Sequence, residues 1–66
     1  MTIGKQIQAL RRAHGWTQHD LAVKLGCRSM TISTWETETH TPDWSTLARL
    51  AEVLECKLIV KLEPKQ

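Results

Sequence analysis

Three residues that end helices divide this chain into helical segments that are too short to fold alone. Gly15 and Gly26 favour the left-handed conformation in which helices commonly terminate, and Pro42 cannot extend a helix because it lacks a backbone N–H. The segment between the two glycines allows barely two helical turns, and a helix of that length is marginal in water. The sequence therefore predicts several short helices that stabilise one another by packing.

Capping residues and apolar spacing predict the bounds of the first two helices. Thr2 is suited to cap the first helix, which ends at Gly15 and carries an apolar stripe of Ile3, Ile7 and Leu10. Thr17 begins the second helix and forms a shortened capping box with Asp20, three residues further on. The inner face of the second helix consists of Leu21, Ala22 and Leu25, and Gly26 ends it.

The same reasoning predicts two further helices. The third runs from residue 28 or 29 to residue 36 or 37, and a polar loop leads from it to Pro42. Asp43 then caps a fourth helix with apolar positions at Trp44, Leu47, Leu50, Ala51 and Leu54. Trp35 and Trp44 are predicted to pack in the core, and Trp16 to be partly exposed; the alternative for tryptophans is stacking on bases.

The C-terminal segment changes from a helical to a strand pattern. Its apolar residues Leu58, Val60 and Leu62 alternate with Lys57, Lys61 and Glu63, and Pro64 closes the run. Because nothing else reads as a strand, residues 57–62 are predicted to pair with a second copy around Ile59, and the alternative is a frayed tail. The predicted fold is therefore all-α in one domain over residues 1–66. Four helices lie within 2–55, and a dimerisation strand within 56–63 contributes Leu58, Ile59, Val60 and Leu62.

The residues that enzymes and metal sites need do not occur in suitable patterns. No nucleophile–base pair, paired carboxylates or phosphate-binding loop is present, so we expect no enzymatic activity. Cys27 and Cys56 have no histidine at zinc-ligand spacing, so we expect free cysteines, no metal and no cofactor. The sequence has no apolar run that could span a bilayer and no signal-peptide pattern, so the expected location is the cytoplasm, without membrane contact.

Charge and the outer face of the third helix both indicate an anionic partner. Residues 1–35 carry five Lys or Arg against one Asp. Opposite Ile32, the third helix presents small polar side chains and one methionine, at Ser29, Met30, Ser33, Thr34 and Thr37. An ordinary solvated helix face carries Lys and Glu. Two short helices joined at Gly26 form a helix-turn-helix, whose second helix fits the major groove, so the predicted partner is double-stranded DNA.

A longer set of residues resembles a known family. The set comprises Thr17-Gln18, Leu21-Ala22, Leu25-Gly26, Thr31-Ile32-Ser33, Trp35-Glu36, Pro42, Leu47 and Leu50-Ala51. It resembles the phage lambda repressor and Cro class over about residues 3–55. The strand-like tail is similar to the C-terminal strand of some members, including antitoxins of the Hip kind, where it joins two subunits.

The resemblance implies roles for particular residues. Base contacts are expected from Arg28, Ser29, Met30, Ser33 and Thr34. Phosphate contacts are expected from Thr17, Gln18, Lys24, Thr37 and Thr39. Gln18 would also brace the recognition helix, and Arg11 would pair with Glu36 in a structural ion pair. For Arg28 the alternative is a phosphate contact, and for Met30 a position tucked beneath the turn.

Two positions depart from the family pattern. Arg28 stands where the family usually has Ser or Thr, so the third helix loses its usual N-cap; Ser29 is the alternative cap, which would remove it from base contact. The loop after Glu36 is typically basic and contains Gly, whereas here Glu38 would repel phosphate. We therefore expect weak DNA contacts from each monomer and part of the specificity from DNA shape.

The predicted function is a DNA-binding transcriptional regulator. The sequence favours a homodimeric repressor that reads a palindromic operator through the major groove. The alternative is an antitoxin that binds a toxin protein and represses its own operon.

Overall fold

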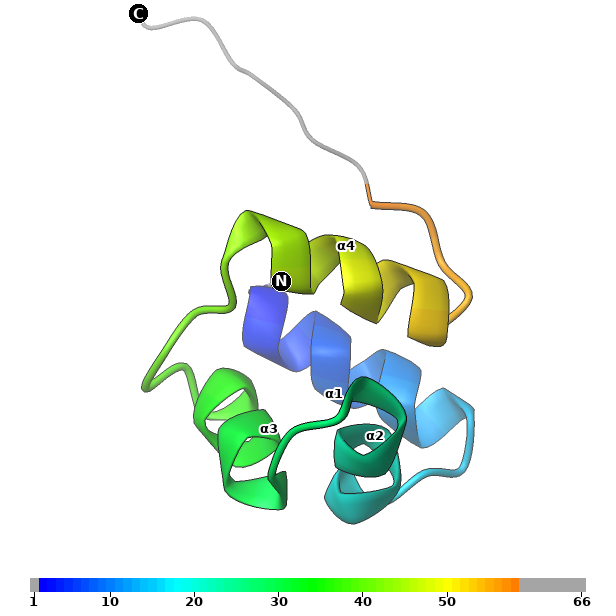
Figure 1. Ribbon diagram of the computed structural model, residues 1–66, viewed down its shortest axis with the longest axis horizontal. Coiled ribbons are helices and arrows are strands. Elements are labelled where there is room, and N and C mark those ends of the chain that lie inside the picture. The colour runs from blue at the N-terminus through cyan, green and yellow to red at the C-terminus, as the bar shows by residue number, and fades with distance from the viewer. Residues whose placement is uncertain (1, 59–66) are drawn as a thin grey trace, which may run out of the picture.

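The computed structural model describes residues 2–58 and places four α-helices in them. They are α1 (Ile3–Ala13), α2 (Gln18–Leu25), α3 (Ser29–Glu36) and α4 (Trp44–Val53) (Figure 1). The predicted all-helical, four-helix architecture is confirmed. Of the predicted strand segment 56–63, Cys56, Lys57 and Leu58 fall among the described residues, and they form neither helix nor strand; Ile59, Val60 and Leu62 lie outside them.

Side chains cap three of the four helices, as the sequence predicts. Thr2 Oγ1 accepts from the N–H of Lys5 at 3.3 Å. Asp43 Oδ1 accepts from the N–H of Thr46 at 2.8 Å. In the capping box of α2, the Thr17 N–H donates to Asp20 Oδ2 at 2.8 Å and the Asp20 N–H donates to Thr17 Oγ1 at 3.0 Å. These bonds satisfy N–H groups that a helix leaves without internal partners.

The turn between α2 and α3 leaves α3 without a side-chain cap. Gly26 has a φ of 76°, the left-handed conformation predicted for it, and it ends α2. Arg28 is extended at the N-cap position of α3, and its side chain makes no capping hydrogen bond. Ser29 does not replace it, because Ser29 is the first residue of the helix and its Oγ lies 3.4 Å from Nδ1 of His19.

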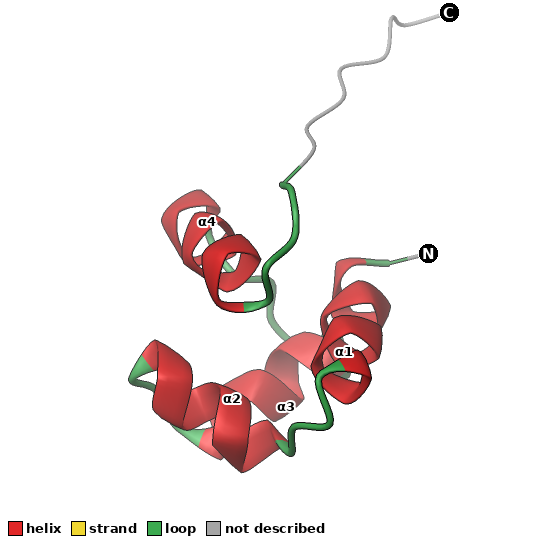
Figure 2. Ribbon diagram, turned by 90° about the vertical axis from the view of Figure 1, so that its right-hand side faces the viewer, coloured by secondary structure: helices red, strands yellow, loops and turns green. Residues whose placement is uncertain are grey.

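The core lies where α1 and α2 pack against α3 and α4 packs against α2. Leu21 and Ile32 are completely buried at its centre, and six other apolar residues surround them: Ile7, Ala22, Leu25, Trp35, Leu50 and Leu54. Gly4, near the start of α1, lies against the backbone of α3. A Cβ on Gly4 would overlap the carbonyl oxygen of Trp35, so glycine is needed for α1 to approach α3 this closely. Figure 2 shows α4 above the α2–α3 pair, with α1 to the right.

The burial of the tryptophans corrects one expectation. Trp35 is buried and Trp16 is half-buried, as predicted, whereas Trp44 is 60 % exposed. The buried stripe of α4 is centred on Leu50 and Leu54. Trp44 is the first residue of the helix, and at 100° per residue it falls at the edge of this stripe rather than at its centre. The periodicity places Trp44 near the core, but the neighbouring helices do not cover it.

The end of α3 contains a strained residue. Glu38 has a φ of 63°, a left-handed conformation that disfavours side chains. This conformation turns the chain so that the Thr39 N–H donates to the Thr34 carbonyl at 2.9 Å, which closes the helix end. Glycine is the usual residue at such a position because it has no Cβ.

We expect Glu38→Gly to stabilise the protein by about 1 kcal/mol, because it removes the steric cost of a side chain in this conformation. In a domain of this size that gain corresponds to a rise of roughly 4–8 °C in Tm, measurable by circular dichroism. Glu38→Ala is the matched control, since it removes the same carboxylate but keeps the Cβ. An equal rise in both variants would assign the effect to charge and contradict the prediction.

Candidate nucleic-acid interface

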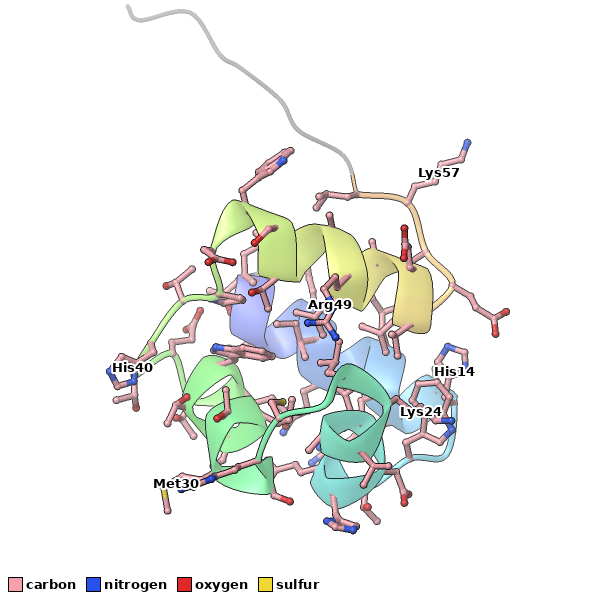
Figure 3. The ribbon with its side chains drawn as sticks, in the orientation of Figure 1. His14, Lys24, Met30, His40, Arg49 and Lys57 are labelled. Atoms are coloured by element: carbon pink, nitrogen blue, oxygen red, sulfur yellow. The ribbon has the colours of Figure 1, made fainter. Side chains whose placement is uncertain are left out.

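The outer face of α3 projects from the molecule beside α2. Ile32 is completely buried on the inner side of α3, whereas Met30 on the outer side is 76 % exposed. In Figure 3, Met30 points away from the rest of the molecule. The five residues predicted to contact bases all belong to this face or directly precede it: Arg28 and Met30 are exposed, and Ser29, Ser33 and Thr34 are partly exposed. The alternative prediction, in which Met30 is tucked beneath the turn, is wrong.

Two threonines on this side use their hydroxyl hydrogens internally. Thr34 Oγ1 donates to the Thr31 carbonyl at 2.7 Å, and Thr37 Oγ1 donates to the Ser33 carbonyl at 2.9 Å. Their oxygens keep lone pairs for a donor, because a hydroxyl both donates and accepts. Thr34 is therefore suited to accept a hydrogen bond from a base amino group rather than to donate one.

A buried ion pair fixes α3 to α1. The guanidinium of Arg11 donates to both carboxylate oxygens of Glu36, from Nε to Oε2 at 2.7 Å and from Nη2 to Oε1 at 2.9 Å. Nη1 of Arg11 donates to the Trp16 carbonyl at 2.7 Å. Both charged residues are buried, with 7 % and 9 % exposure for Arg11 and Glu36. The structure thus brings together the two residues that the family resemblance paired.

Gln18 adds a third element to this pair. Its Nε2 donates to Glu36 Oε1 at 3.2 Å, which joins the first residue of α2 to the last residue of α3. Burial acts to raise the pKa of Glu36, but the hydrogen bonds from Arg11 and Gln18 outweigh it and the pKa is lowered. The pair therefore stabilises the fold fully above the ordinary carboxyl range, and this contribution is lost as the pH falls through the lowered pKa.

The residues predicted to contact phosphate divide into two groups. Thr17, Gln18, Thr37 and Thr39 lie at the N-terminus of α2 or just after α3. Thr37 and Thr39 are exposed, with their hydroxyl oxygens 3.1 Å apart. Lys24 lies elsewhere: its Nζ is 4.6 Å from the centre of the Trp16 ring, and Figure 3 shows it beside His14, away from Met30. The structure does not bring Lys24 to the outer face of α3.

Sequence reasoning missed three side chains that join the helices. Arg49 Nη2 donates to the Leu25 carbonyl at 2.6 Å, which ties α4 to the end of α2; Arg49 lies between these helices in Figure 3. His14 Nε2 donates to the Leu54 carbonyl at 2.8 Å. His19 contacts Ser29, as described above. Each partner lies 10 to 40 residues away along the chain, and no local pattern indicates such a contact.

Residues 2–58 contain no cluster of three or more His, Cys, Asp or Glu side chains that could hold a metal ion. Cys27 and Cys56 are both free thiols, and burial raises the pKa of Cys27. No helix in the described part of the chain is long and apolar enough to cross a membrane.

The family is established by comparison with known proteins. The helix-turn-helix family matches residues 7–60, which is most of the chain. The protein therefore belongs to the helix-turn-helix family, and the predicted class is confirmed: it is a repressor-like domain of the kind found in DNA-binding regulators.

Two curated relatives are antitoxins. Antitoxin HipB of Escherichia coli K12 is 34 % identical over 53 residues, covering 80 % of this chain and 57 % of HipB. HipB of Escherichia coli O6:H1 is 29 % identical over 56 residues, covering 85 % of this chain and 60 % of that protein. The chain thus spans less than two thirds of the length of these relatives.

Three solved structures share the fold. The P22 c2 repressor, solved with a synthetic operator, gives a TM-score of 0.81 at 28 % identity, with 86 % of each chain covered. SinR, a master regulator for biofilm formation solved with DNA, gives 0.78 at 28 % identity, covering 85 % of this chain and 90 % of SinR. A chain of the HipA-HipB-O2-O3 complex gives 0.71 at 26 % identity, covering 92 % and 86 %.

We expect Arg11 and Glu36 to behave as one energetic unit. Arg11→Ala or Glu36→Ala leaves a buried charge without its partner, which costs about 3–5 kcal/mol of unfolding free energy. The double variant should lose less than the sum of the single losses, as measured by chemical denaturation. Arg12→Ala, at the exposed neighbouring arginine, is the control and should change stability little. Strictly additive losses would show that the two residues act independently.

Proposed function

We propose that the protein is a homodimeric transcriptional repressor that binds a palindromic operator, with α3 of each subunit in the major groove. The observation that carries this proposal is the outer face of α3, where exposed Arg28 and Met30 flank small polar side chains. A helix of this kind fits a groove about 12 Å wide, because small side chains allow close approach to base edges.

The anchoring of α3 supports this role. A recognition helix reads bases only if its position is fixed to within a fraction of an ångström. The bonds from Arg11 and Gln18 to Glu36 hold the last residue of α3, and the buried Ile32 and Trp35 hold its inner side. The exposed face is therefore presented on a rigid support.

The chemistry of the face suggests which bases it reads. Arg28 can donate two hydrogen bonds to guanine O6 and N7. Met30 offers an apolar contact for a thymine methyl, and Thr34 offers a lone pair to an adenine or cytosine amino group. Ser29 and Ser33 can bond to several bases. Of these side chains, Arg28 discriminates most sharply, because a bidentate pair fits one base.

Phosphate contacts would position the helix without specifying sequence. The Gln18 amide has a second N–H beyond the one that it gives to Glu36, and a phosphate oxygen can accept it. The oxygen of Thr17 accepts from the Asp20 N–H, so its own hydrogen can be donated to phosphate. Thr37 already gives its hydroxyl hydrogen to the Ser33 carbonyl, so of the neighbouring pair Thr37 and Thr39 it is Thr39 that would turn its hydroxyl hydrogen to a phosphate.

We expect Arg28→Ala to relax base preference at one position in each half-site. The loss of a bidentate pair removes roughly 1–3 kcal/mol of discrimination between the preferred and the wrong base. Duplexes selected from random DNA, in matched and mismatched versions, would supply the titrations. Arg12→Ala, the exposed arginine of α1, should leave the preference unchanged. A uniform loss of affinity in Arg28→Ala would instead identify Arg28 as a phosphate contact.

The dimer is proposed from the C-terminal end of the chain. Leu58 lies with residues of α1 and α4 around an apolar hollow of about 210 Å³, lined also by Ile3, Ile7, Leu10, Leu47, Leu50 and Leu54. The sequence that follows continues the apolar alternation through Val60 and Leu62. Two such segments, pairing antiparallel around Ile59, would bring further apolar side chains to this hollow. The resulting dimer would place two copies of α3 about 34 Å apart, one turn of B-DNA.

Val60→Pro is expected to prevent this pairing, because proline removes a backbone donor from the strand. Light scattering should then give the monomer mass of 7.6 kDa where the parent gives twice that value, with operator binding largely lost. Val60→Thr, a β-branched replacement that keeps the donor, should remain dimeric. A parent that is monomeric at high micromolar concentration would refute the proposed dimer.

An antitoxin role is the second candidate function. It is favoured by the likeness to antitoxin HipB and to a chain of the HipA-HipB-O2-O3 complex, and it is compatible with repression of the protein's own operon. Purification from the source organism with a second, unrelated protein in fixed stoichiometry would support this role. Recovery of the DNA-binding dimer alone would favour the simple repressor.

A further inference from the structure

A histidine on α2 contacts the recognition helix on its outer side. His19 is the second residue of α2 and is exposed to solvent. Its Nδ1 lies 3.4 Å from Oγ of Ser29, the first residue of α3. Ser29 itself is partly exposed and immediately precedes Met30, the most exposed large apolar side chain of this face. An imidazole is thus bonded to a residue of the proposed DNA-reading surface.

We propose that His19 makes DNA binding proton-dependent, and that its protonation decides whether Ser29 offers DNA a donor or an acceptor. This inference rests on the proposed function. Histidine is suited to the task because its ordinary titration falls between pH 5 and 8. Its distance from Ser29 places that change of charge directly at the recognition helix.

The hydrogen bond between the two side chains would change direction on protonation. In a neutral imidazole whose Nδ1 carries no hydrogen, Nδ1 accepts the hydroxyl hydrogen of Ser29, which leaves lone pairs facing outward. In the protonated ring both nitrogens are donors, so Ser29 Oγ must accept from Nδ1. The hydroxyl hydrogen of Ser29 is then free to be donated to a phosphate or to a base acceptor.

Charged side chains of α2 and of the α3 N-cap lie near His19. On α2, Asp20 and Lys24 line the same shallow hollow as His19, together with Trp16 and Val23. The pKa of Asp20 is lowered, mainly because its carboxylate accepts a hydrogen bond from the Thr17 N–H. On the side of α3, the charged residue Arg28 directly precedes Ser29.

His14 stacks on the Trp16 ring with 4.2 Å between ring centres, so a second histidine lies near this hollow. A DNA phosphate would add a negative charge that the free protein lacks. Protonation and DNA binding then favour each other, so affinity rises as the pH falls.

The test compares binding of an operator duplex at pH 8.0 and pH 5.5, at constant ionic strength, by fluorescence anisotropy. For the wild type we expect about fivefold tighter binding at pH 5.5, the gain of a charge-assisted over a neutral hydrogen bond from His19 to a DNA phosphate. The slope of log affinity against log salt should also steepen by about one at pH 5.5, because one more cation meets a phosphate. Circular dichroism at each pH would verify that the protein stays folded.

Matched variants assign the effect to His19. His19→Gln keeps a donor and an acceptor but cannot be protonated in this range, so its affinity should not change between the two pH values. His40→Gln, an exposed histidine in the loop after α3, should keep the wild-type pH response. Ser29→Ala should keep the gain in affinity but lose any change of base preference with pH.

The outcomes separate this inference from the proposed function. A wild type that binds its duplex equally at both pH values, or a His19→Gln variant with an undiminished pH response, would overturn the role of His19 and leave the repressor intact. Failure to bind any duplex at either pH would overturn the proposed function itself, and this inference with it.

Discussion

The arrangement of this small protein depends on one buried ion pair. Arg11, near the end of α1, donates two hydrogen bonds to Glu36 at the end of α3. It also donates one to the Trp16 carbonyl in the turn between α1 and α2. Two charges with less than a tenth of their surface exposed are costly to bury unless every polar atom finds a partner. That requirement fixes how α1, the turn and α3 are placed relative to one another.

The remaining inter-helical contacts extend this placement to the other helices. Gln18 joins the start of α2 to the same carboxylate, and Arg49 ties α4 to the final carbonyl of α2. The absent Cβ of Gly4 allows α1 to approach the end of α3. Burial of the apolar core supplies most of the driving force for folding in a domain of this kind, but the hydrophobic effect is non-directional. The polar contacts therefore select one packing of the four short helices. The exposed face of α3 is a product of that selection.

This packing of the four helices leaves several side chains outside the core. The exposed indole of Trp44 and the apolar hollow around Leu58 lie on the α4 side of the molecule, and the side chains proposed to meet DNA lie on α3. The two surfaces are therefore separate, and in the proposed dimer the partner subunit would sit on one and DNA on the other. His19 of α2 lies on the α3 side, with its Nδ1 3.4 Å from Ser29 Oγ.

The sequence by itself determined the ends of the helices and most of their inner faces. Thr2, Thr17, Asp43 and Gly26 act through hydrogen bonds and backbone preferences that span four residues or fewer, so each is visible in a short window of sequence. The pairing of Arg11 with Glu36 came from likeness to a family, because no local pattern relates residues 25 positions apart. Only the tertiary structure decided that Trp44 is exposed, that the Lys24 ammonium lies over the Trp16 ring, and that His19 contacts Ser29. These outcomes depend on the angles and offsets at which helices pack, and such angles are set by the whole core at once.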